Sequence, residues 1–291
     1  MPARPLILDF VATSKRIPRV LSIAGSDSGG GAGIQADLKA FARCGVHGMT
    51  AITAVTWQNT VAVEGVTPIP PEAIVGQVRA VAEDIGVDAV KIGMLGTVEA
   101  VEAVAQALDL VGAAPVVLDP VMVAESGARL LEPEAEAALA GLLLPRATVA
   151  TPNAHEAIAL LETAGSRVAT DPESMARALH ELGPQAVVVT GGHLGEREAT
   201  DVYFDGEHVE RISGPRYPGG ASHGSGCTHS SVLAAQLALG LDPLDAARVA
   251  KGIASEAVRD GLSEIGAGAG PVDVLGLARL PGARRPGART G

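Results

Sequence analysis

A cysteine follows a short glycine-rich turn in the segment HGSGCTHSS, residues 223–231. The residues after it, SVLAAQLALGL, have helical character, so we expect a helix to begin near Cys227. The first N–H groups of a helix lack intrahelical partners and carry the positive end of its dipole. Gly224 and Gly226 lack Cβ atoms, so an anion can approach these amides closely. The same field is expected to lower the pKa of Cys227, whose thiolate could abstract a proton or attack an electrophile.

Two other interpretations of this segment stay open at this point. Ser225 and Thr228 could simply cap the helix, with Cys227 as a small buried residue. Alternatively, His223 and His229 are close enough in sequence to suggest a cysteine hydrolase. Closeness in sequence does not place an imidazole on the sulfur, and no third group that would orient it is visible.

A second glycine-rich segment, GSDSGGGAGIQAD, covers residues 25–37 between an expected strand and an expected helix. It fits neither the GxGxxG dinucleotide fingerprint nor the Gly-Lys-Ser/Thr ending of a P-loop. We interpret it as a loop whose backbone can approach a small ligand closely. The alternative is a flexible turn that Asp27 caps.

Acidic side chains stand at two expected strand ends. Asp119 follows the apolar run VVL, and Asn153 and Glu156 lie three residues apart where a strand gives way to a helix. Carboxylates in such places suit Mg²⁺, which proteins hold through one or two carboxylates together with substrate phosphates. Glu156 could instead only complement the helix dipole. Together with the anion site near Cys227, these residues predict phosphoryl transfer.

Short Val- and Ile-rich runs alternate with Ala-rich helical patterns along the chain. Strands are expected at 19–25, 48–56, 61–69, 89–93, 114–121, 147–153 and 185–192, followed by a hairpin at 201–213 that turns at Asp205-Gly206. Helices are expected at 33–45, after Pro70-Pro71, and at 97–108, 133–145, 154–162, 171–182, 227–240 and 243–261. This alternation predicts an α/β fold, with a mostly parallel sheet covered by helices on both faces. In such folds ligands bind beyond the carboxyl ends of the strands.

The composition narrows the class of protein. The chain has 291 residues, 47% of them hydrophobic, and a net charge of −11, which argues against a nucleic-acid partner. No apolar run is long enough for a bilayer. Two cysteines, Cys44 and Cys227, form no disulfide framework, so we expect a cytoplasmic protein. We predict an N-terminal extension at 1–18, a single domain at 19–277 and a mobile basic tail at 278–291.

Seven motifs occur in an order and spacing typical of one enzyme family: AGSDSGGGAGIQADLKAF, AVTWQNT, KIGML, VVLDPVM, TPNAHEA, GGH and HGSGCT. From about Val20 to about Val272 the chain resembles the hydroxymethylpyrimidine kinase/phosphomethylpyrimidine kinases of thiamine biosynthesis, members of the ribokinase-like superfamily. The resemblance implies a ribokinase-like α/β fold and two ATP-dependent steps. The first would phosphorylate the hydroxymethyl group of 4-amino-5-hydroxymethyl-2-methylpyrimidine, and the second would convert the monophosphate into the diphosphate.

The resemblance also implies an acceptor site. Gln58 would pair with the aminopyrimidine ring, since its amide carries both a donor and an acceptor. The loop formed by Gly224, Ser225, Gly226 and Cys227 would hold the transferred phosphoryl group, with Cys227 as the base for the hydroxymethyl proton. The other implied pocket residues are Gly25, Ala32, Asp37, Met94 and Val121.

On the nucleotide side, the resemblance implies that Asp119 and Glu156 act around Mg²⁺. The residues implied at the ATP are Asn153, Thr190, Gly191, Gly192, His193 and Lys251. Thr190 departs from the family, which often has Lys before GGH, so part of the charge on the phosphate side is missing or comes from elsewhere. The late segment GAGAGPVDV lacks the two histidines of the family's pattern, which puts its role in doubt.

Two further functions compete with the pyrimidine kinase. A pyridoxal kinase of the same superfamily acts on a similar small hydroxymethyl heterocycle, although Gln58 and the loop at 25–37 favour the pyrimidine. A sensor that binds the pyrimidine without turnover would have no use for the anion loop and the acidic strand ends. The family also suggests a homodimer.

Overall fold

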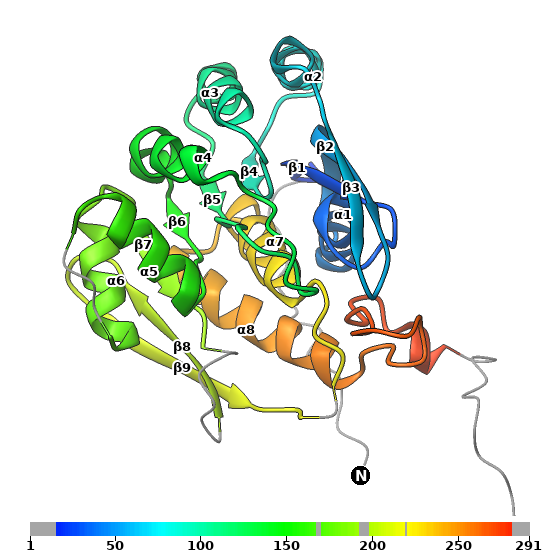
Figure 1. Ribbon diagram of the computed structural model, residues 1–291. Coiled ribbons are helices and arrows are strands. Elements are labelled where there is room, and N and C mark those ends of the chain that lie inside the picture. Colours follow the sequence, from blue (N-terminus) through cyan, green and yellow to red (C-terminus); the bar gives the residue numbers. More distant parts are fainter. Residues whose placement is uncertain (1–15, 167–169, 192–197, 219, 281–291) are drawn as a thin grey trace, which may run out of the picture.

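The computed structural model describes residues 16–166, 170–191, 198–218 and 220–280. These residues form one nine-stranded sheet with the order β3-β2-β1-β4-β5-β6-β7-β8-β9 (Figure 1). The strands are β1 (Arg19–Asp27), β2 (His47–Gln58), β3 (Val63–Pro68), β4 (Ala89–Ile92), β5 (Val116–Leu118), β6 (Val149–Ala150), β7 (Ala186–Val189), β8 (Glu198–Phe204) and β9 (Val209–Pro215).

The central strands are parallel. β1 pairs in parallel with β2 and β4, and the parallel pairing continues through β5, β6 and β7. Only β3 at one edge and the β8–β9 hairpin at the other pair antiparallel. The carboxyl ends of six parallel strands therefore meet at one edge of the sheet.

Helices cover both faces of the sheet, as the sequence predicts. One apolar cluster packs α2, α3, α4, α5 and α6 on one face, and a second packs α1, α7 and α8 on the other. The helices are α1 (Gly33–Cys44), α2 (Pro71–Asp84), α3 (Val98–Ala107), α4 (Pro133–Ala138), α5 (Ala154–Thr163), α6 (Pro172–His180), α7 (Ser225–Ala238) and α8 (Pro243–Arg259). The predicted α/β class with helices on both faces is confirmed.

Most element boundaries follow the sequence signals. α1 ends at Gly45, which adopts the left-handed conformation with a φ of 73°. The helix expected at 133–145 differs: α4 stops at Ala138, a π-helical turn covers Leu139–Leu143, and a 3₁₀ turn follows at Leu144–Arg146. Pro145 lacks a backbone N–H and so cannot continue a regular α-helix. β5 and β6 are also shorter than the strands expected at 114–121 and 147–153.

The described residues extend slightly past the predicted domain limits, and residues 1–15 and 281–291 of the predicted extension and tail lie outside them. Arg16 pairs with Asp88, and Leu277–Arg279 form a 3₁₀ turn from which Arg279 pairs with Asp260. The boundaries at 18 and 277 stay a prediction.

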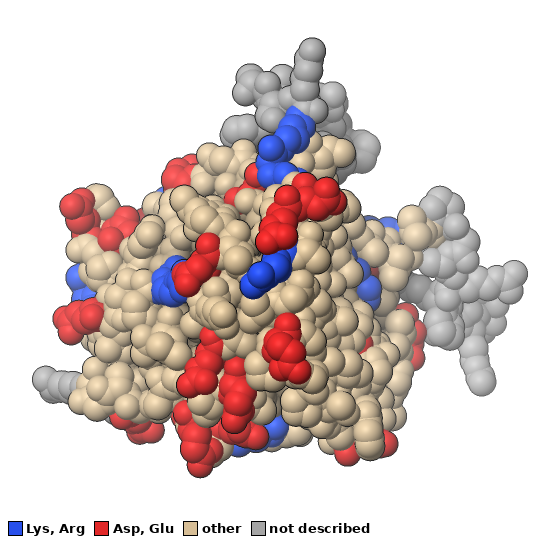
Figure 2. All heavy atoms as spheres, turned by 90° about the horizontal axis from the view of Figure 1, so that it is seen from above, with Lys and Arg blue, Asp and Glu red and all other residues tan. Residues whose placement is uncertain are grey.

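Figure 2 shows the molecule from above, where acidic and basic side chains are interspersed and the acidic ones are more widespread. A groove of about 580 Å³ runs between α2 and α3, lined by residues such as Glu72, Arg79 and Glu102. It lies on the outer surface of these two helices, away from the residues discussed below. Among the described residues, no helix is long and apolar enough to cross a membrane.

Candidate active site

The two glycine-rich segments of the sequence contact each other in space. An added Cβ on Gly224 would overlap the backbone carbonyl of Gly31, and one on Gly31 would overlap the imidazole of His223. Gly224 also has a φ of 83°, which other residues rarely adopt. The loop after β1 and the start of α7 can therefore approach this closely only because both positions are glycine.

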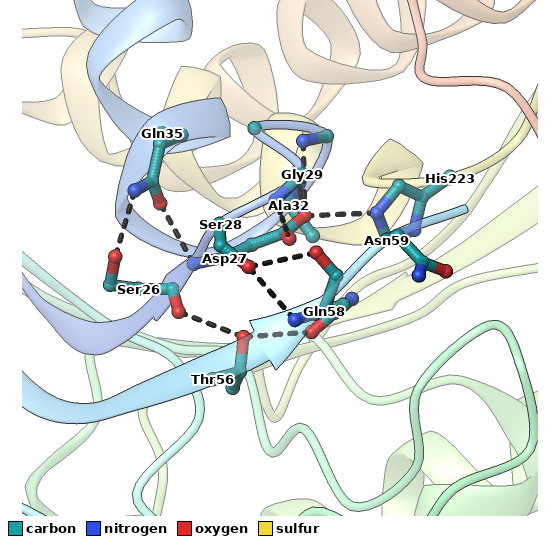
Figure 3. Close-up of polar contacts among 12 residues, drawn as sticks. Ser26, Asp27, Ser28, Gly29, Ala32, Gln35, Thr56, Gln58, Asn59 and His223 are labelled. Atoms are coloured by element: carbon teal, nitrogen blue, oxygen red, sulfur yellow. Dashed lines mark hydrogen bonds and ion pairs between the residues drawn. The ribbon is translucent and has the colours of Figure 1, made fainter. Parts of the chain in front are cut away.

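Asp27, at the end of β1, organises the first of these loops (Figure 3). Its Oδ1 accepts the N–H of Gly29 at 2.7 Å, and its Oδ2 accepts those of Gly31 at 3.0 Å and Ala32 at 2.8 Å. The Nε2 of His223 lies 3.0 Å from the same Oδ2. Burial alone would raise the pKa of Asp27, but the hydrogen bonds from His223 and the loop amides lower it below the ordinary value.

Gln58 stands beside this loop at the end of β2 (Figure 3). Ser28 bonds the backbone of Gln58 in both directions, donating to its carbonyl and accepting from its N–H, each at 2.8 Å. The side-chain Oε1 accepts from Thr56 at 3.2 Å, while its NH₂ group donates to no atom of the described residues. The amide of Gln58 is thus held at one end and has free donors at the other.

The start of α7 leaves backbone donors unused. The helix begins at Ser225, two residues before the predicted start, with Gly224 as its N-cap and no side-chain cap. Ser225 N–H donates to Ser222, but within the described residues those of Gly226 and Cys227 find no acceptor. These two free amides at the positive end of α7 can bind an anion.

A buried lysine lies under this helix start. Lys91 of β4 is fully buried, with its Nζ 3.0 Å from Asp37 Oδ1 and 3.6 Å from Asp119 Oδ2. Ser231 donates to Asp37 at 2.7 Å, and Ser230 donates to Asp119 at 2.9 Å. Burial would lower the pKa of Lys91, but the nearby Asp37, Cys227 and Asp119 together raise it, so Lys91 stays charged.

Asp119, which lies beside this lysine, forms a pair of buried carboxylates with Glu156. Burial, and then the charge of Asp119, raise the pKa of Glu156 to about 8. Burial also raises the pKa of Asp119, although Lys91 and Ser230 act against the rise. Two buried carboxylates that resist ionisation together form a donor set that a divalent cation would satisfy, so the residues fit Mg²⁺.

Glu156 also has a local role in its helix. Its Oε2 accepts the backbone N–H of Asn153 at 2.9 Å, and the side chain of Asn153 accepts the N–H of Glu156 at 3.0 Å. This reciprocal capping box begins α5. Glu156 therefore stabilises the start of α5, as one of the two interpretations of the sequence held. This local role does not exclude a role in binding Mg²⁺.

A second buried cluster lies at the end of β7. Asp201 of β8 accepts from the N–H of Gly191 at 3.0 Å and from Lys251 at 2.7 Å, and His229 Nε2 lies 3.4 Å from its other oxygen. Burial would raise the pKa of Asp201, but His229 and Lys251 lower it below the ordinary value. Thr190 joins this region to the start of α5, because its N–H donates to Pro152 at 2.9 Å.

Comparison with known proteins shows which family this chain belongs to. The family model described as Phosphomethylpyrimidine kinase matches residues 27–273. The chain belongs to this family. It is 48% identical to the hydroxymethylpyrimidine/phosphomethylpyrimidine kinase of Rhizobium meliloti (strain 1021), over 87% of this chain and 95% of the relative.

Solved structures agree with the family and with the predicted ribokinase-like fold. A pyridoxal kinase from Staphylococcus aureus in complex with AMP-PCP and pyridoxal is similar at a TM-score of 0.80 and 33% identity, covering 91% of this chain and 96% of that one. A phosphomethylpyrimidine kinase from Clostridium difficile 630 is similar at a TM-score of 0.71 and 39% identity, covering 83% of this chain and 99% of that one.

Most residues predicted for the pocket of this family member lie at the carboxyl ends of neighbouring strands. Gly25 N–H donates to the carbonyl of Met94 at 3.1 Å, and there is no room for a Cβ between Gly25 and the Met94 sulfur. Ala32 donates to Asp27, and Val121 follows Asp119 after β5. The contacts of Gly25 and Ala32 join the ends of β1 and β4 to the loop beside Gln58.

Asp37 occupies a different place from the predicted pocket lining. It is fully buried, and Ser22, Ser231 and Lys91 take up its two carboxylate oxygens. It therefore supports the site from beneath. The predicted nucleotide residues Gly192 and His193 lie outside the described residues.

The expected low pKa of Cys227 is wrong for this arrangement. Desolvation raises the pKa of the thiol to about 12, and Asp119 and Asp37 add to the rise, while Lys91 and the N–H of Gly33 act against it. The prediction considered only the dipole of α7 and missed the burial of the thiol and the nearby carboxylates of Asp37 and Asp119. The geometry also disfavours the cysteine hydrolase, because the imidazoles of His223 and His229 face Asp27 and Asp201.

Several functional-site residues were missed by sequence reasoning. Lys91 had a visible signal, since it interrupts the apolar run AVKIG of a central strand. Asp201 and Ser230 gave none, because their partners lie far away in the sequence. The late segment whose role the sequence left in doubt contacts the site: Gly268 N–H donates to Thr60 at 3.2 Å, and Val272 N–H donates to His223 at 3.1 Å.

Proposed function

We propose that the chain is an ATP-dependent kinase that phosphorylates 4-amino-5-hydroxymethyl-2-methylpyrimidine and then its monophosphate to the diphosphate. One observation carries the proposal: the glycine loop beside Gln58 contacts the start of α7 at Gly31 and Gly224, so the acceptor loop and the free amides are neighbours. Phosphoryl transfer needs this arrangement, because the acceptor oxygen and the phosphate must lie in line.

The free amides of Gly226 and Cys227 would hold the transferred phosphoryl group. They point outward from α7, and Gly224 and Gly226 keep side chains away from them. Ser225 opens the same turn. Because these donors are fixed by a buried helix, they need no reorganisation as charge develops on the phosphoryl oxygens.

Cys227 would accept the proton of the hydroxymethyl group. Desolvation raises the pKa of this thiol to about 12, so it is mostly protonated at neutral pH, and the charges around it modify how well it can act as a base. Lys91 favours the thiolate, whereas Asp119 and Asp37 oppose it. Neutralising Asp119 on substrate binding would therefore make Cys227 a better base.

Asp119 and Glu156 would hold Mg²⁺ together with the phosphates of ATP. The bound ion would neutralise charge on the transferred phosphoryl group and its leaving group. The two carboxylates suit this role because burial raises the pKa of both, with a further rise from Asp37 at Asp119 and from Asp119 at Glu156.

ATP would lie along the ends of β6 and β7. Asn153, Thr190 and Gly191 follow these strands, and Lys251 reaches the same place through its contact with Asp201. The solved pyridoxal kinase that resembles this chain was determined with AMP-PCP, an ATP analogue, which supports ATP as the phosphoryl donor. Lys251 would supply part of the positive charge that Thr190 lacks.

Pyridoxal is the second candidate substrate, since a pyridoxal kinase is among the similar structures. The pyrimidine is favoured because the R. meliloti relative is 48% identical, against 33% for that pyridoxal kinase. The free NH₂ group of Gln58 can donate to a ring nitrogen, and its Oε1 can accept from the amino group of the pyrimidine.

The test is an ADP-release assay coupled to a dehydrogenase, with ATP, Mg²⁺ and one acceptor at a time. We expect turnover with the hydroxymethylpyrimidine and with its monophosphate, and at least tenfold lower kcat/KM with pyridoxal. Absence of pyrimidine-dependent ADP would contradict the kinase function. A preference for pyridoxal would change the assigned substrate and keep the reaction class.

We also infer a cytoplasmic homodimer that binds neither nucleic acid nor membranes, with one kinase domain at 19–277. The net charge of −11 argues against a nucleic-acid partner, and the two cysteines fit a reducing compartment. The homodimer rests on the family resemblance alone. Sedimentation of the purified protein with and without DNA tests both the homodimer and the expected lack of DNA binding.

A further inference from the structure

One buried contact joins the two halves of the site and has no part in the proposed mechanism. Asp27 and His223 are 196 positions apart in the sequence, and their exposed fractions are 3% and 7%. Nε2 of His223 donates to Oδ2 of Asp27 over 3.0 Å (Figure 3). The contact therefore connects the end of β1 with the segment that leads into α7.

Asp27 fixes the shape of its own loop. Three backbone N–H groups between Gly29 and Ala32 converge on its carboxylate, and the side chain of Gln35 accepts the N–H of Asp27 itself at 2.9 Å. A carboxylate that accepts several N–H bonds is strongly held in one orientation. The loop beside Gln58 thus has a defined shape before any ligand binds.

His223 is fixed just as firmly from the other side. Its backbone N–H donates to Gly270 at 3.3 Å, and its carbonyl accepts the N–H of Val272 at 3.1 Å. Its ring packs on Gly31 so closely that no Cβ fits between them. The next residue, Gly224, is the N-cap of α7. A shift of His223 would therefore move the helix start that carries the free amides.

We propose that Asp27 and His223 are positioning residues whose contact sets the acceptor loop against the phosphoryl-binding amides of α7. The inference rests on the proposed kinase function and adds two residues to it. Neither side chain has to touch a substrate. Their contact fixes the distance between the two halves, and a displacement of about 1 Å between reacting groups can cost about 100-fold in rate.

The proposal predicts a division between chemistry and binding. Each half keeps its own ligand contacts when the link is cut, so His223→Leu should lower kcat by about 10-fold to 100-fold. The dissociation constants for the pyrimidine and for AMP-PCP, measured by calorimetry, should change by less than about threefold. A merely structural role would instead lower stability and both affinities together.

Two more variants sharpen the test. His223→Gln places an amide donor near the position of Nε2 and should recover most of kcat. Asp27→Asn combined with His223→Leu should lower kcat no further than the stronger single variant does, because both remove one interaction. Ser222→Ala is the matched control: it removes a side-chain bond of the adjacent residue, to Glu125 at 2.7 Å, and should leave kcat unchanged.

The outcomes separate the two proposals. A wild-type protein without pyrimidine-dependent ADP release overturns the kinase function and the positioning role with it. An active wild type with a folded His223→Leu variant whose kcat stays within twofold overturns the positioning role alone, as does a loss confined to binding. If His223→Leu does not fold, by circular dichroism, His223→Phe keeps the ring volume without the nitrogen and decides by the same criteria.

Discussion

The site contains two kinds of buried carboxylate. The carboxylate of Asp27 is surrounded by donors from its own loop and from His223, and its pKa lies below the ordinary value. Asp119 and Glu156, the carboxylate pair, have raised pKa values, that of Glu156 being about 8. The carboxylate of Asp27 is thus satisfied by donors of the protein itself, whereas the carboxylate pair is the place where the proposed Mg²⁺ would add positive charge.

The largest expected effect is at Cys227, which lies next to the carboxylate pair. Cys227→Ala should lower kcat by about 10²-fold to 10⁴-fold, the range for loss of a general base. Pyrimidine affinity should hold, since the proposed ring contacts are with Gln58. Single-turnover kinetics and calorimetry measure the two quantities. Near-wild-type turnover of the variant would discard Cys227 as the base.

A tenfold to 100-fold effect on the Mg²⁺ requirement is expected when the carboxylate pair is changed. Glu156→Gln removes one of two anionic donors, so the Mg²⁺ concentration for half-maximal velocity should rise by about this factor. Asp27→Asn is the contrasting variant, because donors of the protein itself satisfy the carboxylate of Asp27, and it should leave the Mg²⁺ requirement unchanged. Equal shifts of the Mg²⁺ requirement in both variants would contradict the distinction between Asp27 and the carboxylate pair.

An effect of about tenfold is expected at Gln58. Gln58→Ala removes hydrogen bonds to the aminopyrimidine, and one bond worth about 1.4 kcal/mol changes affinity tenfold. The dissociation constant of the pyrimidine should rise while AMP-PCP binding stays constant. Calorimetry with each ligand checks this, and an unchanged pyrimidine affinity would place the ring elsewhere.

The smallest effects are slopes of stability against pH, and they should have opposite signs. Glu156 has a pKa of about 8 in the folded chain and about 4.3 when unfolded, so the folded state binds more protons between these values. Without divalent ions, the free energy of unfolding should therefore fall as pH rises from about 5 to about 8. Urea denaturation should show a flatter slope for Glu156→Gln.

Asp27 gives the opposite case. Its folded pKa lies below the unfolded value of about 3.9, so its stabilisation is present above that pH and is lost as the pH falls below about 4. Asp27→Asn should lose stability at neutral pH and lose less than the wild type on acidification. A parallel pair of curves for wild type and variant would contradict the lowered pKa.

Local sequence signals were sufficient for most of the fold. Apolar periodicity located the strands and helices, and Gly45 marked the end of α1 as predicted. The break in the helix after Ala138 was missed, although Pro145 gave a warning of an irregular end. The edge position of β3 and the turn at Asp205-Gly206 also agree with the sequence.

The site was less predictable, because its energetics depend on contacts between distant segments. The dipole of α7 alone predicted a low pKa for Cys227, but desolvation of the thiol raises that pKa, and Asp119 and Asp37 from other segments add to the rise. Asp27 was visible only as a possible cap, since its link to His223 depends on how α7 packs against the sheet that contains β1. Lys91 could have been found from its charge within an apolar strand.

The central part of helix α7 is enclosed, since every residue from Thr228 to Gln236 is buried. A segment packed on all sides cannot slide or tilt without opening voids, which proteins tolerate poorly. Any closure over bound ligands must therefore come from the segments around α7. The helix itself is expected to stay in place when ligands bind.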